Sequence, residues 1–304
     1  MTAKLLEGEA VARSVMDDVA ARTAKLITKG TTPGLATVLV GDDSASAGYV
    51  KKKHEACASV GMYSLNVELD RETSQDELHE VIRGLNDDGS IHGFLIQHPL
   101  PPHLDFGRAL LEMDPGKDAD GLHPMSLGSL AIGLEAPIPA TPAGVRAMFL
   151  HYDIPTSGRH VVVIGRGPTI GRPLSLLLGQ RGAGANAAVT VVHSGVRDLS
   201  AYTRQADIVV AGVGQPGIVQ PDMVREGVVV VSAGITWEGK RLLPDVDESV
   251  GEKASWITPR LGGLGVTTVA MLLQNAVGLA ERQPPGVRPP SESSELGFSA
   301  TVMP

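Results

Sequence analysis

The stretch that decides the fold is His160-Val-Val-Val-Ile-Gly-Arg-Gly-Pro-Thr-Ile-Gly-Arg-Pro173. Its apolar part, Val161 to Ile164, is a continuous β-branched run, which is typical of a parallel strand buried on both faces. Three glycines follow at Gly165, Gly167 and Gly171, and the apolar residues after Pro173 predict a helix. The stretch therefore predicts a strand, a glycine-rich turn and a helix in direct succession.

Such an arrangement is typical of a site for the phosphates of a dinucleotide. Glycines let the backbone approach the pyrophosphate, and the first turn of the helix offers unpaired N–H groups. The GxGxxxG spacing is one residue longer than the common fingerprint. On this stretch alone, a purely structural strand-to-helix turn therefore stays open as an alternative.

The next predicted strand, Ala188 to Val192, bears on which dinucleotide is bound. Sheets specific for NAD usually place an acidic residue at the end of this strand, where it binds the ribose hydroxyls. Here the strand is followed by His193, and no acid occurs before Asp198. Three side chains are instead candidates for a 2′-phosphate, namely Arg166, Ser194 and Arg197. The pattern favours NADP, although His193 could be an ordinary strand-end histidine and Arg197 a surface charge.

Composition limits the class of protein. The 304 residues are enough for one large or two medium domains, and 42% are hydrophobic and 20% charged, as in a soluble globular enzyme. A net charge of −8 argues against nucleic acid or an anionic membrane as the main partner. The single cysteine, Cys57, excludes an internal disulfide and a cysteine-based zinc site. We see no signal peptide and no stretch of about 18 apolar residues, so we expect a cytoplasmic protein without a membrane span.

Periodicity predicts an α/β fold with two open α/β domains. The first alternates helices and strands up to a strand at residues 93–97, with Ser74 and Glu77 as a capping box before the third helix. The second is predicted to be a Rossmann-like, doubly wound parallel sheet with strands at 161–164, 188–192, 207–210 and 228–231. The expected boundaries are 1–140 for the first domain, 141–266 for the second, 267–282 for a C-terminal helix that packs back on the first, and 283–304 for a disordered tail.

Polar residues with possible chemistry cluster at three places in the first domain. Tyr49 and Lys53 are four residues apart on a predicted helix, so both lie on one face, as suits a flat polar heterocycle. Gln97 ends a buried strand, where it could bind a ligand or Lys53. In the loop Lys117-Asp-Ala-Asp-Gly121, one carboxylate could accept two N–H donors of an amino-heterocycle. Each place also has an ordinary interpretation: a solvated basic face, a plain strand end, and, for Asp118, an Asx-type turn.

Taken together, these motifs resemble the family of bifunctional methylenetetrahydrofolate dehydrogenases/methenyltetrahydrofolate cyclohydrolases (the FolD family). The resemblance covers about residues 1–282. It rests on separated motifs that read VGDDSASAGYVKKK, GFLIQHPLP, PGKDADGLHP, TPAG, VVVIGRGPTIGRP, ADIVVAGVGQP and TPRLGGLG with TTVAMLL after it.

The resemblance implies roles for particular residues. Tyr49 is expected to stack on the pterin of the substrate, Lys53 to be the catalytic group held by Gln97, and Asp120 to bind the amino edge of the pterin. Further substrate contacts are expected at Gly262 and Gly263. The residues expected to bind NADP are Gly165, Arg166, Gly167, Gly171, Ser194, Arg197, Gly212, Gly214 and Ile235. The family also implies a homodimer built through the nucleotide domains and a role in one-carbon metabolism and purine biosynthesis.

The chemistry fits a site with few catalytic groups. Hydride loss from 5,10-methylenetetrahydrofolate leaves a cation delocalised over two nitrogens, so this step needs positioning more than acid–base help. Hydrolysis of the methenyl product to 10-formyltetrahydrofolate needs a base for water and an acid for a ring nitrogen, and one lysine with a lowered pKa could serve as both. Two alternatives stay open: a dehydrogenase of the same fold with weak or absent cyclohydrolase activity or another heterocyclic substrate, and a non-catalytic NADP-binding paralogue.

The sequence also departs from the usual family motifs. The unusual residues are His98, Ala140, Gly167, Ser232 with Ala233, and Leu261, Val266 and Thr267 in the usual PGGVGPMT loop. Tyr49, Lys53, Gln97 and Asp120 are all present. We therefore expect both activities, with the loop changes affecting rates and cofactor affinity.

Overall fold

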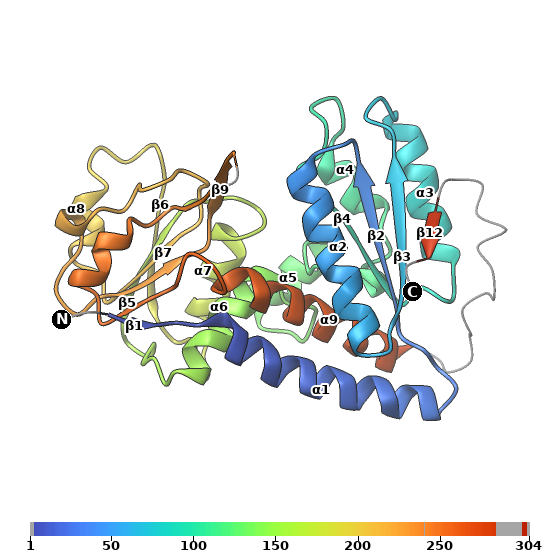
Figure 1. The fold of residues 1–304 in the computed structure, drawn as a ribbon, viewed down its shortest axis with the longest axis horizontal. Helices are drawn as coiled ribbons and strands as arrows, with labels where there is room; N and C mark the ends of the chain where they lie inside the picture. The colour runs from blue at the N-terminus through green and yellow to red at the C-terminus, as the bar shows by residue number, and fades with distance from the viewer. Residues whose placement is uncertain (1–2, 240, 284–299, 303–304) are drawn as a thin grey trace. The chain divides into compact units, whose positions relative to one another are not determined.

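The computed structural model describes residues 3–239, 241–283 and 300–302. The chain forms two compact units, and each is built around its own sheet (Figure 1). The four-stranded unit consists of Ser14–Ser129, Ala136–Ile138 and Leu272–Pro304, and the six-stranded unit of Met1–Arg13, Leu130–Glu135 and Pro139–Met271. Three helices contribute residues to both units: α1 (Gly8–Thr28), α5 (Pro124–Ile132) and α9 (Leu264–Arg282).

In the structure the start of the chain, up to Arg13, is grouped with the six-stranded unit. The reason is the short strand β1 (Lys4–Leu5), which pairs in parallel with β11 (Trp256–Ile257) at the edge of the six-stranded sheet. The predicted disordered tail lies mostly outside the described residues. Within it, Gln283 donates a hydrogen bond to the carbonyl of His92, and Ala300–Val302 forms strand β12.

The four-stranded unit follows the alternating pattern that the sequence predicts. Its further elements are β2 (Gly34–Val40), α2 (Ser44–Ser59), β3 (Tyr63–Leu69), α3 (Gln75–Asp87), β4 (Gly93–Ile96), α4 (Phe106–Glu112) and the 3₁₀ turn η1 (Pro115–Lys117). The sheet order is β12-β3-β2-β4, in which β2, β3 and β4 are parallel and β12 is antiparallel to β3. The predicted capping box before α3 is present, with the Ser74 and Glu77 side chains each bound to the other's backbone N–H.

Successive residues of a strand point to opposite faces of a sheet, and β2 uses both faces. Ala36 and Val38 belong to the apolar core that contains Leu78 and Ile82 of α3. Thr37, between them, instead bonds His54 of α2. The helices α2 and α3 therefore cover opposite faces, and the α2 side contains buried polar groups.

The C-terminal helix packs on the four-stranded unit as predicted, although it begins three residues earlier than expected. Asn275 of α9 donates to the carbonyls of Ala119 (3.0 Å) and Ile138 (2.8 Å), and Glu281 pairs with Arg22 at 2.7 Å. Among the described residues, α9 alone is long and apolar enough to cross a membrane, and 56% of that stretch is buried within the protein, as expected of a core helix.

The six-stranded unit contains the predicted parallel sheet. Its further elements are α6 (Ala140–His151), β5 (His160–Ile164), α7 (Gly171–Gly179), β6 (Ala188–Val192), α8 (Ser200–Thr203), β7 (Ile208–Ala211), η2 (Pro221–Met223), β8 (Val229–Ser232), β9 (Ile235–Glu238), β10 (Arg241–Pro244) and η3 (Glu248–Glu252). The order β1-β11-β8-β7-β5-β6 places β6 on one side of β5 and β7 on the other. The order in which successive strands are added therefore reverses at β5, although β5 and β7 are parallel. Open α/β sheets bind ligands at the carboxyl ends of the strands at such a switch point.

Candidate active site

Lys53 is the centre of a group of polar side chains in the four-stranded unit. It lies on α2, whose first turn is capped by Asp43, since this carboxylate accepts the N–H of Ser46 at 2.8 Å. The Lys53 side chain is only 9% exposed, and its Nζ donates to Oε1 of Gln97 at 2.9 Å. Gln97 follows directly after β4, and its Nε2 donates to the carbonyl of His98 at 2.9 Å, which turns the amide oxygen towards the lysine. The predicted contact between Lys53 and Gln97 is present.

Burial changes the titration of this lysine. Loss of hydration lowers the pKa of Lys53, and the charge of Asp120 only partly opposes this shift. Burial likewise raises the pKa of Asp120, against the effect of the Lys53 charge. We call Lys53, Gln97, Asp120 and Tyr49 the lysine cluster. Its lysine releases a proton more readily than an exposed lysine does.

The loop that carries Asp120 is fixed by its neighbours. Lys117 is buried, and its Nζ donates to the carbonyls of Leu85 (2.9 Å) and Asp88 (2.7 Å), at the C-terminal end of α3. The Asp118 carboxylate accepts the backbone N–H groups of Leu122 and His123. Asp118 therefore has a local structural role, as expected, and Asp120 is the carboxylate of this loop that interacts with Lys53.

Tyr49 lies one helical turn before Lys53, and burial raises the pKa of its hydroxyl. The ammonium of Lys52 lies 6.0 Å from the centre of the Tyr49 ring, at the outer limit of a cation–π contact. Lys51 and Lys52 are both exposed, and Lys51 forms a pair with Glu55 at 3.8 Å, so these two lysines are the solvated face of the basic stretch and Lys53 is not.

A buried polar chain beneath Lys53 was not predicted. His54 Nε2 lies 2.8 Å from Oγ1 of Thr37, which donates to Oδ1 of Asn66 (2.9 Å), whose amide donates to Glu68 (2.8 Å). Because the only hydroxyl proton of Thr37 goes to Asn66, His54 must donate from Nε2. Burial and the nearby Lys53 charge lower the pKa of His54 to about 4, so it is neutral at pH 7. The chain joins α2 to β2 and β3. The available sequence signal was one polar residue, Thr37, in the otherwise apolar β2, and polar residues at alternate positions of β3.

The six-stranded unit holds the predicted phosphate turn at its switch point. Gly165 has φ +113°, and a Cβ on it would lie 2.7 Å from the carbonyl oxygen of Gly212, after β7. A Cβ on Gly171, at the start of α7, would lie 2.2 Å from the Gly165 oxygen. We call Gly165, Gly171 and Gly212 the glycine cradle. Gly165 and Gly171 need glycine because backbone approaches backbone, whereas a Cβ on Gly212 would lie 3.0 Å from the Ile170 side chain. The geometry fits a dinucleotide, whose pyrophosphate requires such an approach at a helix start.

Gly167 differs from the glycine cradle. A Cβ on Gly167 would meet no atom within 4 Å, and the residue has no positive φ. The structure thus explains why the family's common serine and this chain's glycine are both compatible with the turn. Arg166, before it, is exposed.

The end of β6 carries no acidic group for ribose hydroxyls. Ser194 and Arg197 are exposed in the turn after this strand. Asp198, the first acid, accepts the N–H of Ser200, the first residue of α8, at 2.9 Å. The side chains near the strand end are therefore suited to a phosphate rather than to a ribose diol.

The remaining predicted positions also lie in the six-stranded unit. Gly214 has φ +66°, and its carbonyl accepts the Thr236 hydroxyl at 2.9 Å, next to Ile235 at the start of β9. Gly262 has φ +70°, and its carbonyl accepts the N–H of Gly8 at 2.7 Å. Gly263 is adjacent to it, so the loop before α9 is held by the start of α1.

The altered residues of that loop have different environments. Leu261 is 67% exposed and Val266 is 36% exposed. Thr267 is buried, its hydroxyl donates to the carbonyl of Leu264 at 2.7 Å, and a Cβ on Gly144 would lie 2.6 Å from it. Thr267 therefore supports the start of α9, whereas Leu261 and Val266 are available for contacts.

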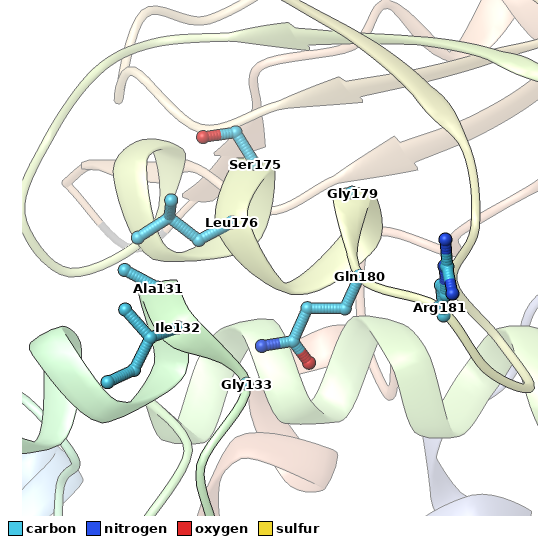
Figure 2. Close-up of a pocket in the computed structure, with 8 residues that line it drawn as sticks. All are labelled: Ala131, Ile132, Gly133, Ser175, Leu176, Gly179, Gln180 and Arg181. Carbon is cyan, nitrogen blue, oxygen red and sulfur yellow. The ribbon is translucent and has the colours of Figure 1, made fainter.

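A surface pocket of about 590 Å³ lies between the end of α5 and the end of α7 (Figure 2). Leu176 and Ile132 form apolar parts of its lining, and Gln180 and Arg181 lie at its other side. Gln180 also bonds the carbonyl of Leu130. The pocket is at the opposite end of α7 from Gly171, and no predicted site residue lines it, so we assign it no part in the reaction.

Comparison with known proteins agrees with these features. Residues 6–120 match the model of the tetrahydrofolate dehydrogenase/cyclohydrolase catalytic domain, and residues 139–284 match that of the NAD(P)-binding domain of the same family. The chain is 59% identical over 283 residues to the bifunctional protein FolD of Syntrophotalea carbinolica, covering 93% of this chain and 98% of that protein.

Solved structures have the same fold. The bifunctional FolD enzyme of Campylobacter jejuni is 41% identical, with a TM-score of 0.87 over 91% of this chain and 98% of that chain. The methylenetetrahydrofolate dehydrogenase-cyclohydrolase of Trypanosoma brucei, solved with NADP and an inhibitor, is 35% identical, with a TM-score of 0.87 over 93% and 98%. The predicted two-domain α/β fold, enzyme class and nicotinamide-nucleotide cofactor are confirmed. The chain therefore belongs to the tetrahydrofolate dehydrogenase/cyclohydrolase family, as its sequence motifs predicted.

Proposed function

We propose that this protein oxidises 5,10-methylenetetrahydrofolate to 5,10-methenyltetrahydrofolate with NADP and then hydrolyses the product to 10-formyltetrahydrofolate. The observation that carries this proposal is the buried Lys53, bound to Gln97 at 2.9 Å and electrostatically coupled to Asp120, in the unit that matches the family's catalytic domain. A protein that only bound NADP would have no need for this arrangement.

In the oxidation, the lysine cluster serves to orient the substrate. The Tyr49 ring stacks on the pterin, and the Asp120 carboxylate accepts two N–H groups from its amino edge. NADP supplies the hydride acceptor when it is bound. Because the positive charge of the product is shared by two nitrogens, no side chain has to transfer a proton in this step.

In the hydrolysis, Lys53 transfers protons. Neutral Lys53 takes a proton from the water that attacks the methenyl carbon, and it then gives a proton to the ring nitrogen that leaves as the C–N bond opens. The lowered pKa of Lys53 suits both transfers, since more of the lysine is neutral near pH 7. Gln97 holds the ammonium in place between the two transfers.

For the cofactor, the glycine cradle would hold the pyrophosphate, and Gly214 and Ile235 would make further contacts. Arg166, Ser194 and Arg197 bind the 2′-phosphate, since the end of β6 lacks an acid. We therefore propose a preference for NADP over NAD. Gly262 and Gly263, and Gly167 through its backbone, complete the set of binding residues.

The proposal extends to assembly and location. The chain forms a homodimer through its six-stranded unit, where the edge strand β6 leaves Val191 37% exposed and nearby Tyr202 is 39% exposed. The enzyme works in the cytoplasm without nucleic-acid or membrane partners, and its product feeds one-carbon metabolism, including purine biosynthesis. The molar mass measured by light scattering tests the dimer.

The activity is tested by an absorbance assay. Purified protein is mixed with 5,10-methylenetetrahydrofolate and NADP, then NAD, and formation of reduced cofactor is followed. Hydrolysis of added 5,10-methenyltetrahydrofolate is measured separately. We expect both reactions, with higher kcat/KM for NADP. Binding of folate without either reaction would contradict the proposal.

A further inference from the structure

A buried carboxylate lies beneath the loop that follows β7. Asp245, directly after β10, is 0% exposed. Its Oδ2 accepts the backbone N–H groups of Val213 (2.7 Å) and Gly214 (3.1 Å). No sequence motif singles out this acid, since it lies far along the chain from the residues that it contacts.

The backbone of Asp245 is held as firmly as its side chain. Its N–H donates to the carbonyl of Gly234 at 3.2 Å, and its carbonyl accepts the N–H of Val219 at 3.2 Å. A Cβ on Gly234 would lie 2.0 Å from Oδ2, so glycine is required there to make room for the carboxylate. The residue therefore joins the loops that follow the neighbouring strands β7 and β8.

If Asp245 only filled space, its burial would be unfavourable in free energy. Oδ1 is buried and has no hydrogen-bond partner among the described residues. Burial raises the pKa of Asp245, although the backbone N–H groups oppose the shift. An apolar residue would avoid this desolvation cost, but it would leave the Val213 and Gly214 amides unpaired. What the carboxylate specifically provides is the conformation of those two residues.

That conformation affects the glycine cradle directly. Val213 and Gly214 follow Gly212, whose carbonyl oxygen would lie 2.7 Å from a Cβ on Gly165. The loops after β5 and β7 thus touch at the switch point of the sheet. A shift of the β7 loop would move the surface that faces the dinucleotide.

We propose that Asp245 is a positioning residue for the dinucleotide, which fixes the Gly212–Gly214 loop in its binding conformation without touching the cofactor. The proposal rests on the assignment of Gly212 and Gly214 to cofactor binding.

The two reactions of this family provide the test, because hydrolysis uses no cofactor. Asp245→Ala removes the acceptor, and Asp245→Asn keeps one acceptor oxygen without the charge. Asp247→Asn changes a half-buried acid that caps η3. For each we would measure NADPH binding by fluorescence, the KM for NADP, the rate of hydrolysis of added methenyltetrahydrofolate, and thermal unfolding.

For Asp245→Ala, we expect NADPH affinity to fall and the KM for NADP to rise about tenfold or more, with hydrolysis changed less than about twofold. Asp245→Asn should lie between this variant and the wild type, and Asp247→Asn should equal the wild type. If Asp245→Ala does not fold, the test is the KM for NADP of Asp245→Asn, which should be higher than that of the wild type. Unchanged NADPH affinity, or equal loss of both reactions, would overturn the proposal. Failure of the wild type to bind NADPH would instead overturn the cofactor assignment on which it rests.

Discussion

The lysine cluster and the glycine cradle are built in opposite ways. The lysine cluster consists of side chains whose ionisation is shifted by burial, and its contact between Lys53 and Gln97 is one hydrogen bond of 2.9 Å. The glycine cradle consists of backbone, and what matters is that side chains are missing, since a Cβ on Gly171 would lie 2.2 Å from the Gly165 oxygen. The first is expected to be sensitive to changes of charge at constant shape, and the second to changes of shape at constant charge.

The two regions also differ in what supports them. The lysine cluster rests on a second layer of buried side chains, including His54, Thr37 and Lys117. The glycine cradle is supported by hydrogen bonds of backbone amides, and the side chain of Asp245 accepts those of Val213 and Gly214. Substitutions in the lysine cluster and substitutions around the glycine cradle should therefore differ in which of the two reactions, oxidation or hydrolysis, they affect more.

The largest effect on binding is expected from Asp120→Asn. The change keeps the size but removes the charge and leaves one acceptor for two N–H donors, which should cost roughly 2–4 kcal/mol of folate binding. Asp118→Asn is the matched control, because Asp118 binds the amides of Leu122 and His123. Asp118→Asn should lower the melting temperature and have little effect on the folate affinity. If Asp118→Asn weakens folate binding more than Asp120→Asn does, the assignment within this loop is wrong.

The next effect is expected from Gly171→Ala. A Cβ 2.2 Å from a backbone oxygen forces the turn apart, and overpacking of this kind costs about 1–3 kcal/mol. NADP binding should weaken accordingly, while hydrolysis of methenyltetrahydrofolate should continue. Gly167→Ala is the control from the same turn, since its Cβ would meet open space. Equal KM values for NADP in the two variants would contradict the account of the glycine cradle.

A third effect concerns stability and pH. His54 has a pKa of about 4 in the folded protein and about 6.5 when unfolded, so the unfolded state binds a proton first as the pH falls. The stability contributed by neutral His54 is complete above pH 6.5 and is lost as the pH falls towards 4. Between pH 7 and 4.5 the free energy of unfolding should fall by roughly 2 kcal/mol less in His54→Gln than in the wild type. Denaturant titrations at both pH values measure the free energy of unfolding. If it falls by the same amount in both proteins, His54 is not the source of the pH dependence.

The smallest effect is expected from Arg166→Ala. An exposed arginine on a phosphate contributes about 1 kcal/mol, so the KM for NADP should rise about fivefold. The KM for NAD, which lacks the 2′-phosphate, should change little. Arg172→Ala, which removes another exposed arginine nearby, should leave both values unchanged. Equal increases for NADP and NAD would show that Arg166 does not distinguish them.

The sequence predicted most strands and the contact between Lys53 and Gln97, because these follow from local apolar runs and from recognisable motifs. It missed β1, since two exposed residues carry no periodic signal and their partner β11 lies at the other end of the chain. It also missed the His54–Thr37–Asn66 chain and Asp245. Their partners are distant in sequence, and only the fold reveals that each is buried and bonded.

The most direct test of the central claim is the ratio of the two reaction rates in Lys53→Gln. The change keeps a side chain able to bond Gln97 but removes the group that titrates. Oxidation of methylenetetrahydrofolate with NADP should continue, whereas hydrolysis of added methenyltetrahydrofolate should fall about 10²–10⁴-fold, so that the methenyl absorbance accumulates. Equal loss of both reactions with folate still bound would show that Lys53 also serves the oxidation. Unchanged hydrolysis would remove Lys53 from the mechanism.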